Sequence, residues 1–278
     1  MNAFLRAESE ATDASYDAWL PKLGLRWRLA ENANLSFVVQ RGFQAGGGTF
    51  DVIDGAVSEF DPEFLWNYEL GLRTLLFDGK LRFNANAYFA DWSNQQVREP
   101  RPDFPFVFTV TNAGESTLFG FEADFSLDAG ADLEFYGAFG YANTEFDRFP
   151  NSRFNPNLPI SDANRPDFNG NRFPFAPRYS ANLGIAYEPV EGLFGGVDAN
   201  YRSSQFRSSA NLAVNRCCER VTVNARLGYR WKNIGISVLA SNLLDKAYYT
   251  TLSAAFTGAE FGTLGEPQTF AVRLDGRF

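Results

Sequence analysis

Alternation between apolar and polar residues, with a period of two, runs along almost the whole chain. In the segment "KLGLRWRLA", Leu23, Leu25, Trp27 and Leu29 share one parity, whereas the basic residues take the other. Successive side chains of a β-strand point to opposite faces, so this period predicts strands with one apolar and one polar face. The pattern recurs in "KLRFNANAYFADW", "TLFGFEADFSL" and "RVTVNARLGYRW", and no segment shows a convincing helical period. We therefore predict an all-β protein.

Eleven segments alternate well enough to be predicted as strands. They cover residues 22–30, 34–43, 64–77, 80–93, 106–128, 131–146, 174–188, 192–206, 220–231, 233–243 and 266–278. Most are longer than the usual soluble strand of about 5–6 residues. Single-chain bacterial barrels have even strand numbers, so an odd count predicts an incomplete barrel.

The connections between these segments alternate between two kinds. Short polar turns lie at 30–34, 77–80, 127–132, 188–192 and 231–233, and long segments rich in Gly, Pro and Asn lie at roughly 44–63, 93–105, 147–173, 207–219 and 244–265. An antiparallel meander places all connections of one kind at the same end. We therefore expect short turns at one end and long loops at the other, which is typical of outer-membrane barrels.

The alternation fits either a soluble sandwich, with one face in water, or a membrane barrel, with the apolar face in lipid. Long strands and charged residues at mid-strand favour the barrel. Aromatic residues of the apolar rows also gather near both strand ends, as expected at two membrane interfaces. They are Trp27, Tyr187, Trp231 and Phe278 near the short turns, and Tyr68, Phe89, Tyr141 and Tyr201 near the long loops. We predict an antiparallel transmembrane β-barrel.

Composition excludes several function classes. Histidine is absent, which excludes Ser-His-Asp and Cys-His catalysis and every His-ligated metal site. The net charge of −8 argues against nucleic acid as a partner. Carboxylate pairs such as Glu122 and Asp124 lie two residues apart on one strand face, which is ordinary barrel lining. We expect no enzyme activity, no cofactor, and neither a catalytic nor a metal site.

Two cysteines occur, and they are adjacent in "NRCCERV". A bond between Cys217 and Cys218 closes a strained ring, so we expect two ordinary loop thiols. Pairing with a segment outside this sequence remains an alternative.

Several stretches resemble TonB-dependent outer-membrane receptors. "LPKLGLRWRLAENANLSFVVQRGFQAGG" and "FDPEFLWNYELGLRTLLFDGKLRFNANAYFADWSNQQV" are similar to the middle of their barrel, and "NAGESTLFGFEADFSLDAG" to the next strand pair. "RFPFAPRYSANLGIAYEP", "VLASNLLDKAYY" and "GEPQTFAVRLDGRF" resemble their last strands in order and spacing. The resemblance runs from about residue 20 to the end, and the ordered set carries it rather than any single motif.

This resemblance implies that residues 1–278 are the C-terminal part of a barrel of about 22 strands. Such receptors also carry a plug domain, a TonB box and a signal peptide. None of these is visible here, because "MNAFLRAESEATDASYD" lacks a charged start followed by an apolar run. We expect eleven strands alone to form an open, curved half-barrel, or to close only by a forced pairing of the edges.

By resemblance, the complete protein lies in the outer membrane of a Gram-negative bacterium. It binds a scarce nutrient there and imports it with energy from TonB. A ferric siderophore is the first expectation for this cargo, with cobalamin or an oligosaccharide as alternatives. Missing histidines disfavour haem, and "NPNL" at 155–158 resembles a haem-receptor motif in the wrong context. The implied partners are membrane lipid, the TonB complex through the plug, and the barrel assembly machinery through the C-terminal strand ending in Phe278.

Two sets of residues follow from this interpretation. Aromatic and cationic loop residues are expected to face an anionic aromatic ligand, unless they pack loops together: Trp92, Arg98, Arg101, Phe104, Tyr248 and Tyr249. Polar mid-strand residues are expected to face the lumen and plug, unless they only satisfy each other: Glu69, Arg73, Arg82, Asn84, Asn86, Glu122, Asp124, Arg226 and Arg230. A different alternative is a stand-alone pore or adhesin, which needs a further strand within residues 1–16, where the alternation is poor.

Overall fold

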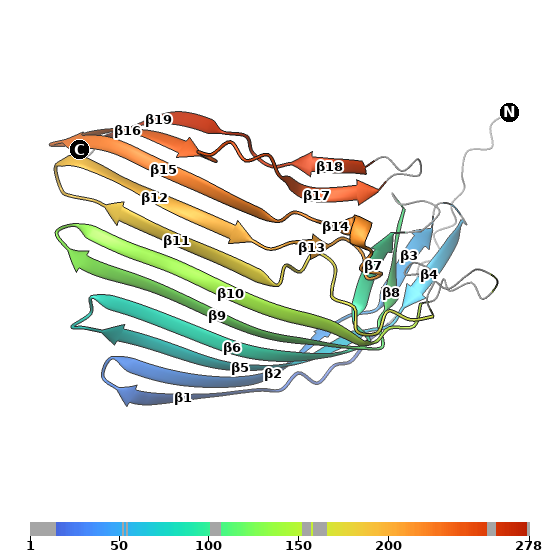
Figure 1. Ribbon diagram of the computed structural model, residues 1–278. Coiled ribbons are helices and arrows are strands. Elements are labelled where there is room, and N and C mark those ends of the chain that lie inside the picture. Colours follow the sequence, from blue (N-terminus) through green and yellow to red (C-terminus); the bar gives the residue numbers. More distant parts are fainter. Residues whose placement is uncertain are drawn as a thin grey trace.

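The computed structural model describes residues 15–51, 53, 55–100, 107–151, 157, 166–254 and 260–276. Its main feature is one antiparallel sheet of eleven strands, in which each strand pairs with the preceding and the following one (Figure 1). In order, they are β1 (Lys22–Ala30), β2 (Ala33–Gln44), β5 (Glu63–Leu76), β6 (Leu81–Ser93), β9 (Glu115–Gly130), β10 (Leu133–Arg148), β11 (Tyr179–Tyr187), β12 (Gly192–Arg202), β15 (Arg220–Trp231), β16 (Ile234–Ser241) and β19 (Thr269–Gly276). The all-β fold and the eleven strands are confirmed.

Short turns join these strands at one end of the sheet (Figure 1). In the "FDGK" turn, Phe77 and Asp78 have φ angles of 53° and 56°. These two residues begin the four-residue connection between the paired Leu76 and Leu81, and the twist of their left-handed conformation matches that of the flanking strands. The positions predicted for the short turns are confirmed.

Four two-stranded sheets and one short 3₁₀ helix lie in the long connections, at the end opposite the "FDGK" turn (Figure 1). They are β3 (Gly47–Asp51) with β4 (Ala56–Phe60), β7 (Gln96–Pro100) with β8 (Phe108–Asn112), β13 (Gln205–Phe206) with β14 (Arg216–Cys217), β17 (Tyr249–Ala254) with β18 (Glu260–Leu264), and η1 (Ala213–Asn215). Phe149 and Phe168, in the described part of 147–173, pack with Val97 of β7. For the described residues of the loops 93–105, 147–173 and 244–265, the predicted placement at one end is therefore confirmed.

Three predicted segments are too wide. The segment 106–128 contains β8 and β9, because the chain leaves the β7–β8 hairpin and enters the main sheet at Ala113 and Gly114. Strand β11 begins at Tyr179, and β12 ends at Arg202, after which the chain enters the β13–β14 hairpin. The sequence alternation continues where a strand leaves the main sheet for a loop hairpin. It therefore does not reveal that the strand has changed its hydrogen-bonding partner.

The register gathers the polar rows on one face of the sheet and the apolar rows on the other. On the polar face, Asn84 lies between Arg73 of β5 and Asp124 of β9. The apolar rows are open, and Leu183 and Leu227 are 61% and 60% exposed. An apolar surface spread over all eleven strands is far larger than the patches that soluble monomers expose. This surface fits contact with lipid.

Two tyrosine rings on the polar face lie across glycines of the neighbouring strand. Tyr88 of β6 pairs with Gly120 of β9, and Tyr136 of β10 pairs with Gly184 of β11. A Cβ atom at either glycine would collide with the ring of its partner. These glycines therefore make room for large side chains between strands that are only about 4.8 Å apart.

The main sheet is open. Its order starts at β1 and ends at β19, and these strands lie at the bottom and top of Figure 1. All nine residues of β1 are exposed. The expected open sheet is confirmed for the described residues. Within the same residues, no helix is long and apolar enough to cross a membrane.

Candidate functional site: the polar face and its loop end

All nine residues predicted to face the lumen lie on the polar face of the sheet. The strand register places them on this face. They are Glu69 and Arg73 on β5; Arg82, Asn84 and Asn86 on β6; Glu122 and Asp124 on β9; and Arg226 and Arg230 on β15. Some of them also form hydrogen bonds with each other or with near neighbours, which was the alternative expectation for these residues. Asn84 donates a hydrogen bond to Asp124 at 2.8 Å, and Asn67 donates one to Glu69 at 2.6 Å. Contact with a plug stays a prediction.

A ladder of amide and carboxylate groups crosses β11, β12 and β15 on the same face. Asn182 donates to Asn200 at 2.9 Å, and Asn200 donates to Asp198 at 2.6 Å. Asn224 donates to the same carboxylate at 2.9 Å. Sequence reasoning missed this ladder. The alternation of the three strands places these residues on the same face as Arg226, so the sequence pattern could have identified them.

Near the short turns, Glu188 forms ion pairs with Arg226 and Arg230. The Arg230 guanidinium also lies 4.6 Å from the ring centroid of Phe194 and donates to the Pro189 carbonyl at 2.7 Å. An open pocket of about 300 Å³ adjoins this group. Sequence reasoning did not single out Glu188, which it placed at the boundary between the strand segment 174–188 and the short turn 188–192.

At the loop end, a buried apolar group forms what we call the loop core: Val97, Ala113, Phe146, Phe149 and Phe168. Phe146 is 0% exposed and pairs in register with Ser116, which is also 0% exposed. Its ring centroid lies 4.9 Å from that of Phe149. Because Phe146 has the parity of the polar face, the loop core covers that face where β10 ends.

Two of the predicted ligand-facing residues pack against neighbouring loops. The Trp92 indole donates to Glu63 at 3.0 Å and stands edge-on to Phe173 at 5.8 Å. The Arg98 guanidinium lies 4.5 Å from the ring centroid of Phe108, within the β7–β8 hairpin. For both residues, the structure shows the packing role that was the alternative expectation.

The other predicted ligand-facing residues lie elsewhere or outside the described residues. Tyr248 precedes β17, and its ring centroid lies 5.2 Å from the Arg220 guanidinium. Tyr249 is 44% exposed at the start of β17. Arg101 and Phe104 lie outside the described residues, as does Phe278. A ligand-facing role for these residues stays a prediction.

Sequence reasoning also missed five arginines at the loop end, which form two groups: Arg172, Arg178 and Arg216 in one, and Arg202 and Arg220 in the other. Arg202 and Arg220 lie directly opposite each other where β12 pairs with β15. Burial lowers the pKa of Arg172, and the positive charges of Arg178 and Arg216 lower it further. Within the part of the chain that the structure describes, the salt bridges involve none of the five.

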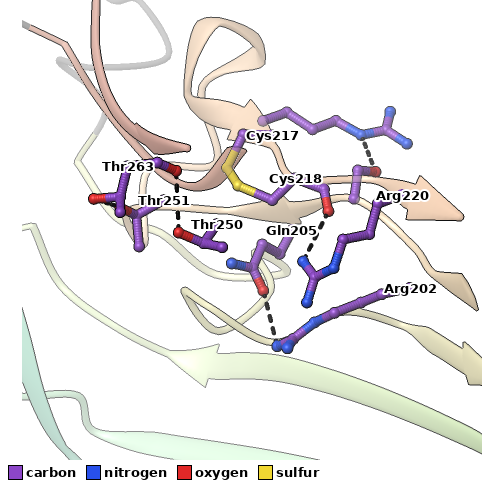
Figure 2. Close-up of a disulfide and its surroundings, with 10 residues drawn as sticks. Arg202, Gln205, Cys217, Cys218, Arg220, Thr250, Thr251 and Thr263 are labelled. Carbon is purple, nitrogen blue, oxygen red and sulfur yellow. Dashed lines mark hydrogen bonds between the residues drawn. A yellow bond between two sulfur atoms is a disulfide. The ribbon is translucent and has the colours of Figure 1, made fainter. Parts of the chain in front are cut away.

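The two adjacent cysteines lie between Arg216 and Arg220 in the sequence. Cys217 and Cys218 form a disulfide, so the expectation of two ordinary loop thiols is wrong (Figure 2). The backbone conformation accommodates the bridge, because Cys217 ends β14 and Cys218 turns the chain with a φ of 78°. Within the described ranges, His, Cys, Asp and Glu side chains form no group of three that could hold a metal ion.

Comparison with known proteins gives consistent matches. The family described as "TonB dependent receptor-like, beta-barrel" matches residues 2–254. The metal-pseudopaline receptor CntO of Pseudomonas aeruginosa is 26% identical over 250 residues, covering 88% of this chain and 32% of that protein. The probable TonB-dependent siderophore receptor PiuA of Acinetobacter baumannii is 25% identical over 221 residues, covering 79% of this chain and 28% of that protein.

The fold also resembles that of solved structures. The crystal structure of the ferric yersiniabactin uptake receptor FyuA from Yersinia pestis superposes with a TM-score of 0.73 and 20% identity, covering 93% of this chain and 37% of that chain. This chain therefore spans about a third of the length of the relatives that it matches.

Proposed function

Because this chain belongs to the TonB-dependent receptor-like β-barrel family, we propose that it forms the C-terminal part of the barrel of an outer-membrane receptor. In this proposal, the complete protein binds a ferric siderophore at the cell surface and imports it with energy from TonB. Receptors of this family are outer-membrane transport proteins of Gram-negative bacteria rather than enzymes.

One observation carries the proposal: the alternation is kept in register across all eleven strands. It produces an apolar face open to its surroundings and a polar face that runs from β1 to β19. A transmembrane barrel needs these two faces, one against lipid and one lining the lumen. The loop core at one end and short turns at the other support an orientation with the loops outside the cell.

The cargo is proposed from the relatives. Their names specify metal-pseudopaline, siderophore and ferric-pyoverdine receptors, which supports a metal chelate as the transported molecule. The polar residues of the sheet would line the path and contact a plug, and the C-terminal strand would be recognised for assembly. A small pore or adhesin has less support, because β1 and β19 are not paired with each other in the described sheet.

The proposal is tested by iron uptake in cells. A strain lacking the gene is complemented with the full gene and supplied with radioactive iron bound to yersiniabactin or to pyoverdine, the chelates named for its structural neighbours. We expect at least one ferric chelate to accumulate only when both this protein and TonB are present. Uptake that continues unchanged without TonB would contradict the proposal.

A further inference from the structure

The β7–β8 hairpin reaches across the loop end of the sheet. It is rooted between β6 and β9, whereas the segment 203–215 is rooted between β12 and β15. Even so, Glu99 of β7 accepts one hydrogen bond from the Ser209 amide at 3.1 Å and another from the Ser209 hydroxyl. Four main strands, β9 to β12, separate the two roots, and adjacent strands are about 4.8 Å apart. The hairpin therefore crosses above these strands as a strap, at a steep angle to them (Figure 1).

The far end of the strap is fixed in a buried polar contact. Ser209 is 0% exposed, and its backbone carbonyl accepts a hydrogen bond from the Asn171 side chain at 2.7 Å. Asn211 accepts the amide of Arg172 at 2.7 Å and donates to the Arg172 carbonyl at 2.9 Å. Breaking such bonds inside a protein leaves buried polar groups without partners, which costs free energy. These contacts hold the strap, residues 171–172 and residues 209–211 in one arrangement.

Apolar packing attaches the middle of the strap to the sheet. Val97 of β7 is 5% exposed and packs with Phe149 and Phe168 in the loop core. Phe173 packs against the same core, and its amide donates to the Thr144 hydroxyl of β10 at 3.0 Å. The strap is thus held to the polar face of the main sheet as well as to the loop at its far end.

The root of the strap is joined to the β3–β4 hairpin. The Gln96 side chain donates to the carbonyls of Ala45 at 2.8 Å and Asp61 at 3.1 Å. Asn112 donates to the same Asp61 carbonyl at 3.0 Å and accepts the Asp61 amide at 2.8 Å. The described residues of 44–61, 93–112, 166–175 and 203–215 therefore form one connected body, which we call the loop wall.

We propose that the loop wall is a preformed recognition surface, which stays docked while the receptor binds its metal chelate and does not fold inward over it. Segments that open easily have few buried apolar contacts, whereas the wall combines an apolar core with hydrogen bonds between loops. A preformed surface avoids the free-energy cost of ordering loops on binding. This inference deepens the proposed function, on which the identity of the ligand rests.

Hydrogen exchange of the receptor, expressed from its full gene and purified in detergent, tests the wall. The Ser209 amide reports on the far end of the strap, and the Phe173 amide reports on its attachment to β10. Exchange is measured without ligand and with ferric yersiniabactin or ferric pyoverdine. We expect both amides to exchange slowly in the free receptor and the chelate to change neither rate more than about twofold. Fast exchange that becomes slow only after binding would overturn the proposal, because the wall would then assemble around the ligand.

Removing the Glu99 carboxylate tests the strap itself. Glu99→Ala should raise the exchange rate of the Ser209 amide about tenfold or more. It should also weaken chelate binding about threefold to tenfold, because binding must then order the released strap. Glu99→Gln keeps an oxygen that can accept both bonds and should restore most of the affinity. Glu59→Ala, at an exposed carboxylate on the neighbouring β4, is the matched control and should change neither quantity.

Affinity that is unchanged or stronger in Glu99→Ala would overturn the proposal, because a strap that must close over the ligand would close more easily once released. Ser209→Ala is the second variant, used where circular dichroism shows that Glu99→Ala has lost strand content. It removes only the hydroxyl bond, so we expect changes in the same direction that are smaller. Unchanged exchange and affinity in Ser209→Ala would likewise overturn the role of the strap.

The same measurements separate the wall from the proposed function. Slow exchange at both amides in a receptor that binds neither chelate would support the docked wall and reject ferric chelate transport. TonB-dependent import of a chelate by a receptor whose wall orders only after binding would do the reverse.

Discussion

The main sheet and the loop core place apolar residues in opposite ways: the sheet exposes them, and the loop core buries them. In the sheet, apolar side chains such as Leu227 point outward and remain 60% exposed, whereas polar side chains line the other face. In the loop core, Phe146 is 0% exposed and is surrounded by other apolar groups, as in a water-soluble protein. One chain is therefore built for two surroundings, lipid around the strands and water around the loops.

The largest effect is expected in the loop core. Phe146→Ala should leave a cavity among Phe149, Phe168 and Val97 and destabilise the loop end by about 3–5 kcal/mol. Hydrogen exchange should show this as faster exchange of the Phe168 amide, which is bonded to the Phe149 carbonyl. Phe270→Ala on β19, at a side chain 60% exposed, is the matched control and should leave that amide unchanged. Equal effects of the two variants would break the contrast between loop core and sheet.

A slightly smaller effect is expected on the apolar face of β15. Ala225→Arg would place a charge in lipid and should cost about 2–4 kcal/mol, whereas Asn224→Arg, one residue away on the polar face, should be far milder. The register supports the pair, since Ala225 lies beside Val197 and Asn224 beside Asp198. Urea unfolding of the protein in liposomes gives both values. Equal penalties would refute the assignment of the two faces.

The smallest effect is expected on the polar face near the short turns. Glu188→Gln removes the carboxylate that Arg226 and Arg230 share, and the group is partly exposed, so the cost should be about 1 kcal/mol and should shrink in high salt. Asp275→Asn breaks the more exposed pair with Arg273 and should cost less. Thermal unfolding at two salt concentrations compares them. A larger loss of stability in Asp275→Asn than in Glu188→Gln would contradict the larger stabilising role expected for the Glu188 ion pairs.

The sheet was predictable because one physical rule determines most of it. A period of two fixes both the strands and the faces, so the parity of Asn84 or Arg226 was enough to place it. The loop end follows no such rule. Phe146 belongs to a regular strand, yet it is buried because loops return over it, and such contacts between distant segments leave no local pattern. Ser209, for example, donates its backbone amide to Glu99 at 3.1 Å across 110 residues.

The loop-end arginines and the disulfide were missed for the same reason. Arg172 and Arg216 come from separate loops, and only the folded chain shows that burial, with the charges of Arg178 and Arg216, lowers the pKa of Arg172. The cysteines were visible in the sequence, but their pairing depends on the turn that Cys218 makes after β14. The aromatic and cationic loop residues were a weaker guide to the ligand, since Trp92 and Arg98 pack against neighbouring residues.

The most direct test of the central claim is a spin-label accessibility scan along β15 in liposomes. Single cysteines replace residues 222–227 one at a time in the Cys217→Ser/Cys218→Ser background. Oxygen, which concentrates in lipid, and a water-soluble nickel complex are the two relaxing agents. We expect an alternation with period two, in which labels at 223, 225 and 227 respond to oxygen and labels at 222, 224 and 226 respond to nickel. Uniform nickel access at all six positions would contradict a membrane-spanning β15, because it would place both faces of the strand in water.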